Sequence, residues 1–409
     1  MRNGRAPHDE FPNADLGREI MDSPDSPMKA LPSVSDKPND QGHRAHYLGA
    51  GSLAPPLEAE DLRQRAAGLD LSPLDRRCVD EMIAALTREG RLPFAWTPQE
   101  QHYLTRAAEA DVVPYLIYRF KFKVLPERRE VTQFPIHVLV EPTSVCNLRC
   151  VMCFQTDASF TRKPYMGRMD IGLYRDVIDQ AVEGGAGAIS IGSRGEPFLH
   201  PDIGTMLKYA SGRRSVFDLK VITNATRIGE AECHAILSSD VNLVALSIDA
   251  HDKSLYEEIR VNGDFDAVLA NVRRLRQIRD RHYPKSRVEL RVSGVRLRED
   301  QDERSFQAFW SEICDTTVFV RVQRRWNTYE NPVDPATSHA CSFLWDRLYV
   351  WYDGTCNPCD EDYKSLLSPG NVKEQTIREI WTSEGMTRMR AAHQAGQRGT
   401  LIPCDRCGV

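Results

Sequence analysis

The sequence predicts an α/β fold built on a partial (β/α)6 barrel, with a helical extension before it and a small Cys-rich domain after it. Through residues 131–325, short β-rich runs alternate with amphipathic stretches, which is typical of a parallel sheet covered by helices. The chain has 409 residues, 41% of them hydrophobic and 27% charged, so it can bury a large core and is not disordered throughout. After Arg325 the alternation stops, and Cys, Trp and Asp become frequent in residues 326–409.

Two segments precede the barrel. Residues 1–60 contain eight prolines and only two aromatic residues, Phe11 and Tyr47, so we expect residues 1–56 to form a mostly disordered arm. Residues 57–130 predict a helical extension, because Ser72 and Thr97 each precede a proline and have the form of helix N-caps.

Six strands are expected in the core, each followed by a helical stretch. They are predicted at residues 136–140, 188–192, 218–223, 243–248, 288–292 and 318–322. Helical periodicity lies between them, for example at residues 172–182 and 265–281. In the C-terminal segment, residues 345–351 are expected to form a strand before a turn at Asp353-Gly354.

Charge and hydropathy exclude several classes of partner. The net charge of −5 gives no general attraction to nucleic acid or to anionic membranes. No apolar run approaches the length of a membrane span, and the N-terminus lacks the apolar core of a signal peptide. We therefore expect a cytoplasmic protein without a nucleic-acid or membrane partner. In a reducing compartment, its eleven cysteines indicate metal binding or catalysis rather than disulfides.

Three of these cysteines follow the first predicted strand. Cys146, Cys150 and Cys153 have the spacing C-x3-C-x2-C and lie on one short loop. A structural zinc site normally has four ligands, so zinc would need a distant fourth residue. A 4Fe–4S cluster held by three thiolates instead keeps one iron open to another ligand.

This loop resembles that of the radical SAM (S-adenosylmethionine) enzymes, and the resemblance extends over about residues 135–325. It implies that SAM binds the open iron and, after electron transfer, gives a 5′-deoxyadenosyl radical that abstracts hydrogen from a substrate. It also implies an external reductant, such as flavodoxin or ferredoxin, and an adenine contact from Met152.

Further motifs lie at the ends of later strands. Gly195 and Glu196 resemble the GGE motif of the family, which implies that Glu196 accepts a hydrogen bond from the SAM amino group; Arg194 stands where the first glycine of that motif would be. The remaining SAM contacts implied by the resemblance are Asn224, Ser247, Arg260 and Gly294. No general base stands out, and the candidates to line the barrel mouth are Arg194, His200, Arg321, Gln323 and Arg325.

Five more cysteines follow residue 340. The two C-x2-C pairs would suit a zinc ribbon, but the segment resembles the SPASM/twitch extension of radical SAM enzymes, which binds auxiliary 4Fe–4S clusters. Five cysteines fit the shorter, single-cluster twitch form, giving two clusters in the whole chain. The ligands implied by the resemblance are Cys341, Cys359, Cys404 and Cys407. Cys356 is then surplus: a bystander, an alternative ligand or a hydrogen-atom donor.

The arrangement of the auxiliary cysteines is similar to that of radical SAM enzymes of the 2-deoxy-scyllo-inosamine dehydrogenase type. This similarity implies that the chain oxidises or epimerises a sugar-like or aminocyclitol-like small molecule. A peptide maturase acting on a ribosomal precursor is the second hypothesis, although residues 57–130 lack the strand pairs expected of a leader-peptide recognition domain. A non-enzymatic Fe–S or zinc scaffold is the third, and it would leave the SAM-binding residues without a purpose.

Overall fold

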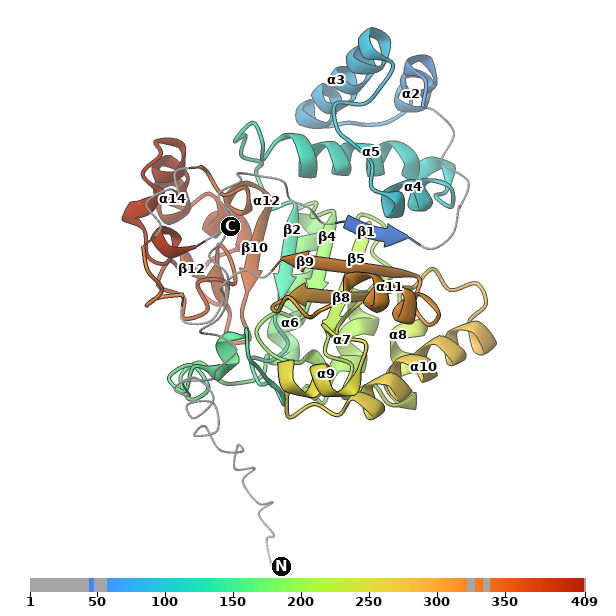
Figure 1. The fold of residues 1–409 in the computed structure, drawn as a ribbon. Helices are drawn as coiled ribbons and strands as arrows, with labels where there is room; N and C mark the ends of the chain where they lie inside the picture. The colour runs from blue at the N-terminus through green and yellow to red at the C-terminus, as the bar shows by residue number, and fades with distance from the viewer. Residues whose placement is uncertain (1–43, 48–56, 322–327, 334–338, 408–409) are drawn as a thin grey trace, which may run out of the picture.

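The structure, a computed structural model, describes residues 44–47, 57–321, 328–333 and 339–407. Six parallel strands form its centre and confirm the predicted partial (β/α)6 core (Figure 1). In spatial order they are β9 (Thr316–Arg321), β8 (Glu289–Arg296), β6 (Leu243–Ser247), β5 (Asp218–Thr223), β4 (Ala188–Ile191) and β2 (His137–Val140). The helices that follow these strands are α6 (Ile171–Glu183), α7 (Ile203–Ala210), α8 (Glu230–Leu237), α9 (Lys253–Ile259), α10 (Phe265–His282) and α11 (Glu303–Ser311).

Alternate residues of each strand face opposite environments. On β5, Leu219 and Val221 are buried in the main hydrophobic core, whereas Asp218, Lys220 and Ile222 line a cavity inside the barrel. Strand β8 repeats this pattern, with Leu290 and Val292 in the core. Because side chains alternate across a strand, one set packs under the helices and the other faces inward. The barrel interior therefore carries charged side chains as well as apolar ones.

The N-terminal extension is helical, and Figure 1 shows it above the barrel strands. Ser72 Oγ accepts a hydrogen bond from the Asp75 amide at 3.2 Å, and Thr97 and Glu100 form a reciprocal capping box, as their sequence predicts. The Tyr118 hydroxyl donates to Asp218 at 2.6 Å, which joins the last of these helices to β5. The four helices are α2 (Ala59–Ala66), α3 (Pro73–Glu89), α4 (Pro98–Leu104) and α5 (Glu109–Val124).

The expectation of disorder through residues 1–56 does not hold at β1 (Arg44–Tyr47). This strand pairs antiparallel with β9. The outer side of β9 would otherwise present unpaired backbone groups, and a strand from the arm covers them. The remainder of the predicted arm, residues 1–43 and 48–56, lies outside the described residues.

The C-terminal segment differs in one respect from the separate domain expected at residues 326–409. Strand β10 (Arg347–Val350) pairs in parallel with β2, so the segment continues the barrel sheet. The predicted strand at 345–351 is shorter than expected, because α12 (Phe343–Asp346) occupies its beginning. The other elements are β11 (Thr355–Asn357), β12 (Gly370–Asn371), α13 (Ile377–Trp381) and α14 (Glu384–Gln394).

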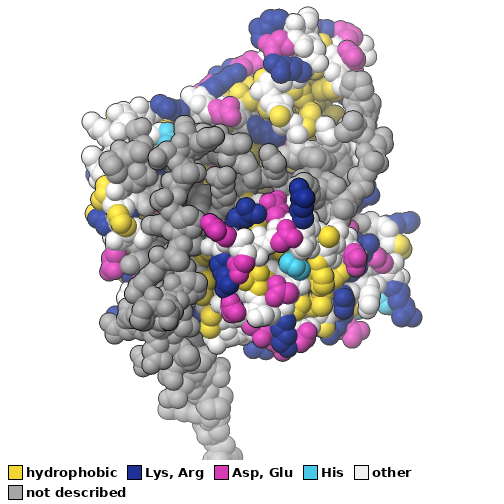
Figure 2. All heavy atoms as spheres, viewed as in Figure 1, with side chains coloured by type: hydrophobic (Ala, Val, Ile, Leu, Met, Phe, Trp, Pro, Cys, Tyr) yellow, Lys and Arg dark blue, Asp and Glu magenta, His cyan; other side chains and the backbone are white. Residues whose placement is uncertain are grey.

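No helix among the described residues is long and apolar enough to cross a membrane. On the face shown in Figure 2, basic and acidic side chains are intermixed with hydrophobic ones over the part that is coloured.

Candidate active site

A cavity of about 2740 Å³ includes the barrel interior and extends to the N-terminal helices, where Tyr103 and Arg119 line it. Its wall includes Cys146, Cys150 and Cys153 together with Glu196, Ser247 and Arg260, which the sequence also predicted to act at the site. Met152 and Asn224 line it too. The cysteine loop and the carboxyl ends of the strands thus share one space, as expected where parallel strands end together.

Each cysteine of the loop has a nitrogen donor close to its sulfur. The donors are Asn224 Nδ2 at 3.8 Å from Cys146 Sγ, Arg260 Nη1 at 3.5 Å from Cys150 Sγ and the Gln155 amide at 3.5 Å from Cys153 Sγ. Hydrogen bonds to cysteine sulfur are among the factors that set the potential of an Fe–S cluster. Three thiols with three N–H donors therefore form a donor set that fits such a cluster.

Arg260 is held in place from two sides. Its Nε donates to Asp249 at 2.6 Å, and Asp249 also accepts the Val295 amide at 2.9 Å. The short strand β7 (Arg260–Val261) pairs with β3 (Arg149–Cys150), which brings the guanidinium beside Cys150. Burial raises the pKa of the Cys150 thiol, and the charge of Arg260 opposes that rise. Arg260, which the resemblance implies as a SAM contact, is thus held at the cavity wall by its ion pair with Asp249.

Glu196 links two strand ends. Its carboxylate accepts hydrogen bonds from the Phe198 amide at 3.1 Å, the Thr223 hydroxyl at 2.7 Å and the Asn224 amide at 2.7 Å. Burial raises its pKa to about 7, although these three hydrogen bonds act in the opposite direction. The carboxylate is thus fixed at the cavity wall, and its second oxygen has one protein donor and room for another.

Gly195 and Ser193 precede Glu196 in the same loop. A Cβ on Gly195 would lie 2.3 Å from the Thr143 carbonyl oxygen, so no side chain fits where this loop meets the segment before Cys146. Ser193 Oγ is buried and has no hydrogen-bond partner among the described residues, yet Ser193 lines the cavity. An unpartnered hydroxyl in the same cavity wall as Glu196 fits a polar ligand such as SAM.

Gly294, the remaining expected SAM contact, is closely packed on one side. A Cβ there would lie 2.6 Å from the Phe319 ring, on the side of β8 that faces the core. The neighbouring Ser293 and Val295 line the cavity instead. The absence of a side chain at Gly294 therefore leaves room for the Phe319 ring.

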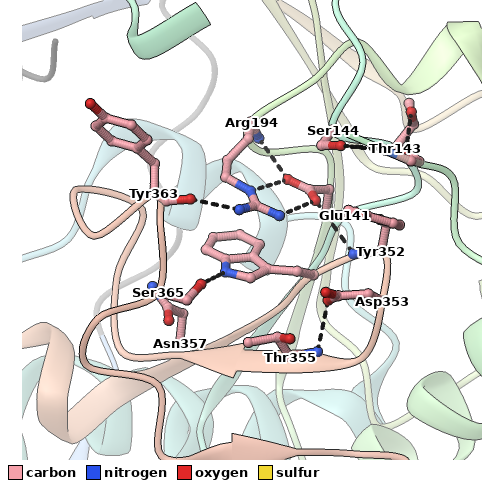
Figure 3. A network of polar contacts seen from close by, with 12 residues as sticks. Glu141, Thr143, Ser144, Arg194, Tyr352, Asp353, Thr355, Asn357, Tyr363 and Ser365 are labelled. Carbon is pink, nitrogen blue, oxygen red and sulfur yellow. Dashed lines mark hydrogen bonds and ion pairs between the residues drawn. The ribbon is translucent and has the colours of Figure 1, made fainter. Parts of the chain in front are cut away.

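Arg194, the departure from the GGE motif, belongs to a buried network drawn in Figure 3. Its Nε and Nη2 donate to the two oxygens of Glu141 at 2.7 and 2.6 Å, and its Nη1 donates to the Tyr363 carbonyl at 2.7 Å. The guanidinium also lies 4.0 Å from the centre of the Trp351 ring. Glu141 follows β2, whereas Trp351 and Tyr363 belong to the C-terminal segment. The ion pair thus joins the barrel to that segment.

The four C-terminal cysteines predicted as ligands line a second, small cavity. They are Cys341, Cys359, Cys404 and Cys407. Arg398, which is buried, donates to the carbonyls of Cys404 at 3.2 Å and Cys407 at 3.1 Å. Burial raises the pKa of the Cys404 thiol to about 12. Uncharged thiols buried together are suited to a metal centre, which replaces their protons.

A single zinc ion and a cubane cluster require different arrangements of these thiols. Zinc needs four ligand atoms about 2.0–2.3 Å from one point. In the part of the chain that the structure describes, no three His, Cys, Asp or Glu side chains converge as one metal ion requires. In a cubane cluster each cysteine binds a different iron, so the sulfurs need not converge.

Cys356 is not among the residues of either cavity. It is fully buried in the main hydrophobic core, and its register partner on β10 is Val350. Cys359, three residues later, leaves the strand and reaches the second cavity. The end of β11 at Asn357 therefore separates the two thiols of the C-x2-C pair.

Comparison with known proteins gives the family. The sequence matches the radical SAM superfamily over residues 140–283 and the SPASM iron-sulfur cluster-binding domain over residues 341–408. It is 32% identical over 301 residues to the tungsten-containing aldehyde ferredoxin oxidoreductase cofactor-modifying protein of Pyrococcus furiosus, covering 62% of this chain and 83% of that protein. The chain belongs to the radical SAM family.

Other relatives of this radical SAM protein match over shorter stretches. The mycofactocin maturase MftC of Mycobacterium tuberculosis is 28% identical over 156 residues, which is 37% of this chain and 38% of that protein. The chain thus spans less than half the length of that maturase. Among solved structures, BtrN in complex with AdoMet and 2-DOIA is 18% identical with a TM-score of 0.48, covering 68% of this chain and 94% of that one.

The cofactors of this radical SAM protein are SAM, a SAM-binding 4Fe–4S cluster and auxiliary 4Fe–4S coordination in the SPASM domain. The residues described above fit both cluster types. Local sequence patterns do not mark Glu141, Gln155 or Arg398, because the partners of these buried side chains are brought to them only by folding. Of the candidates to line the barrel mouth, Arg194 and His200 are buried, and Arg194 lines the cavity. Gln323 and Arg325 lie outside the described residues, as does the side chain of Arg321.

The cluster assignment predicts the iron content. Anaerobically reconstituted protein is expected to hold about eight irons per chain, as two cubane clusters. Changing Cys146, Cys150 and Cys153 together to Ala removes the ligands of one cluster and is expected to leave about four irons and no SAM cleavage. Iron assay, absorbance spectra and 5′-deoxyadenosine formation check this. Stoichiometric zinc without the absorbance of an Fe–S centre would contradict it.

A matched pair of variants separates the two thiols of the C-terminal pair. Cys356→Ala is expected to keep the auxiliary cluster, because this side chain faces the apolar core. Cys359→Ala is expected to lose that cluster or to make it labile. Iron content and electron paramagnetic resonance of each variant measure the difference. Cluster loss in Cys356→Ala with an intact cluster in Cys359→Ala would show the assignment to be reversed.

The ion pair in Figure 3 predicts a large effect on stability. Removing one partner of a buried pair leaves an uncompensated charge, so Arg194→Met is expected to lower the free energy of unfolding by about 3–5 kcal/mol. Arg63→Met breaks the exposed pair with Glu60 and is expected to leave the free energy of unfolding nearly unchanged. Denaturant titration of the holoenzyme compares the two. In a double-mutant cycle, Arg194→Met and Glu141→Gln are expected to be non-additive; additive losses would argue against the pair.

Proposed function

We propose that this radical SAM enzyme oxidises an alcohol group of a sugar-like or aminocyclitol-like small molecule bound inside the barrel. The observation that carries the proposal is the group of charged and hydroxyl side chains in the cavity wall on the strands beside the cysteine loop. Inward-facing strand residues supply it, among them Lys220, Arg291 and Ser293. Such a wall suits a small substrate with many hydroxyl groups, because each hydroxyl needs a partner when it leaves water.

Different residues of the chain would hold the cluster and SAM. When bound, SAM and its cluster supply hydrogen-atom abstraction. Cys146, Cys150 and Cys153 would hold the cluster, and Glu196 would accept the SAM amino group. An external reductant such as flavodoxin or ferredoxin would deliver the first electron.

Oxidation is favoured over epimerisation by the surroundings of Cys356. An epimerisation must return a hydrogen atom to the substrate carbon, and a thiol is the usual kind of donor. Cys356 is absent from the cavity lining and lies among apolar core residues. An oxidation must instead remove a hydrogen atom, an electron and a proton from the alcohol. Four cysteines around the second cavity support full ligation of an auxiliary cluster, which suits electron acceptance.

A peptide substrate is the second candidate. It is favoured by the similarity to mycofactocin maturases, which the chain matches over part of their length. Against it, the described residues of 57–130 form helices only, without the strand pairs expected of a leader-peptide recognition domain. A scaffold without catalysis would leave the polar cavity and its fixed carboxylate unexplained.

Mass spectrometry of the reaction tests the proposed function. Reduced holoenzyme and SAM are incubated anaerobically in heavy water with a cell extract divided into small-molecule and peptide fractions. We expect a product lighter than its substrate by two hydrogens, without deuterium at carbon, and one 5′-deoxyadenosine per product. Product from the peptide fraction alone would favour a maturase. Deuterium at the reacting carbon that disappears in Cys356→Ala would overturn oxidation.

A further inference from the structure

We propose that Lys220, Arg291 and Arg347 form a binding site for an anionic group of the substrate, a carboxylate or a phosphate, inside the barrel. The inference rests on the proposed function and specifies its substrate class. The three cationic residues come from three different strands, and all three line the cavity. We call them the cationic wall.

The strands bring these side chains to the cavity by their alternation. Lys220 lies on β5 between Leu219 and Val221, whose side chains enter the core. Arg291 lies on β8 between Leu290 and Val292, which do the same. Arg347 is the first residue of β10, and Leu348 after it is buried in the core. Because neighbours in a strand face opposite sides, the three cations face inward.

Lys220 carries the strongest signal. Its Nζ makes no hydrogen bond or ion pair to another described residue. Burial lowers its pKa to about 7, and the charges of Arg291 and Arg347 lower it further in the same direction, against the weaker effect of Asp218. Three cationic side chains close together repel one another in the protein without a ligand. An anion bound between them would offset this repulsion and would accept charge-assisted hydrogen bonds from them.

The acidic residues of this wall already have partners. Asp218 accepts hydrogen bonds from Tyr118 at 2.6 Å and Arg119 at 3.2 Å. Asp346 accepts from its neighbour Arg347 at 2.5 and 3.1 Å, and Glu289 accepts from the Thr316 hydroxyl at 2.6 Å. Arg347 thus has one counter-charge, while Lys220 has none within ion-pairing distance among the described residues. The positive charge at Lys220 is left for a ligand.

His137 gives a second, independent observation. It lies opposite Arg347 in the register of β2 and β10 and lines the same cavity. Its Nε2 lies 2.8 Å from Ser190 Oγ, whereas its Nδ1 is buried without a hydrogen-bond partner among the described residues. Burial lowers the pKa of His137 well below its usual value, as do the charges of Arg347 and Lys220. A neutral imidazole with one unused nitrogen can hydrogen-bond a polar ligand that reaches the cationic wall.

The charge of the wall selects among sugar-like substrates. An amino group on an aminocyclitol would be protonated and would be repelled by the cations at short range. A sugar acid or a sugar phosphate would be attracted. The substrate class we infer is therefore a polyhydroxylated anion, with its charged group at the cationic wall and a hydroxyl-bearing carbon toward the cysteine loop.

Anion binding by the holoenzyme tests the inference without knowledge of the substrate. The midpoint of thermal unfolding is measured against inorganic phosphate and, separately, acetate, with chloride keeping the ionic strength constant. We expect phosphate or acetate to raise the midpoint of the wild type. In Lys220→Met, which keeps the length of the side chain, the apparent affinity should fall by roughly tenfold or more, as for loss of a hydrogen bond to a charged group. A stronger response to phosphate would point to a phosphorylated substrate, and a stronger response to acetate to a carboxylate.

Two further variants control for charge and for surface effects. Lys220→Arg keeps a cation at the wall and should retain the response. Lys208→Met removes an exposed lysine from α7 and should behave as wild type. An equal response in Lys220→Met, or a wild-type response no larger than that to chloride, would overturn the cationic wall. SAM cleavage is measured on the same wild-type preparation: if cleavage occurs without anion binding, the wall alone is wrong, and if cleavage is absent, the proposed function fails.

Discussion

The ion pair between Arg194 and Glu141 is the contact through which the two halves of the site are held together. Glu141 continues β2, Arg194 begins the loop that carries Glu196, and the carbonyl of Arg194 accepts a hydrogen bond from Gln155, just beyond the cysteine loop, at 2.7 Å. The same guanidinium donates to the carbonyl of Tyr363, four residues after Cys359. Burying two charges is unfavourable unless every polar atom is paired, and here the bidentate geometry and the Trp351 face provide that pairing. The result is a fixed relation between the cysteine loop and the auxiliary cysteines, on which any electron path between them would depend.

The parallel pairing of β10 with β2 also fixes the position of the auxiliary cysteines relative to the cysteine loop. Strand pairing joins segments about 210 residues apart in sequence, and the ion pair lies where both strands end. The C-terminal segment is therefore positioned by main-chain hydrogen bonds as well as by side chains. A domain attached only by a linker would leave its cluster free to move relative to the barrel.

Local patterns in the sequence were sufficient for the strands and for the arrangement of the cysteines. Residues 218–223 were predicted as a strand and form β5 within the same bounds, because buried alternating runs carry a strong signal. The pairing of β10 with β2 and of β1 with β9 was missed, since partners distant in sequence leave no local trace. Lys220 was missed for another reason.

A polar residue that alternates with apolar ones gives the same sequence pattern whether its side chain faces solvent or an internal cavity. Only the closed curvature of the sheet distinguishes these two positions. The sequence marks Arg194 only as a departure from the GGE motif. The buried ion pair with Glu141 explains why an arginine stands at this position.

The separation of the two faces of each strand explains how the barrel tolerates charges at its centre. The apolar core lies between the strands and the helices α6–α11, where residues such as Val221 and Val292 are fully buried. The inward face adds little to this core, because its side chains border a cavity large enough to contain water and ligand. Stability and binding thus depend on different residues of the same strand. A substitution at Leu219 opens a void in the core, whereas one at Lys220, a single residue further, changes the charge offered to the substrate. Each strand therefore supports the fold through its outer face and forms the cavity wall with its inner face.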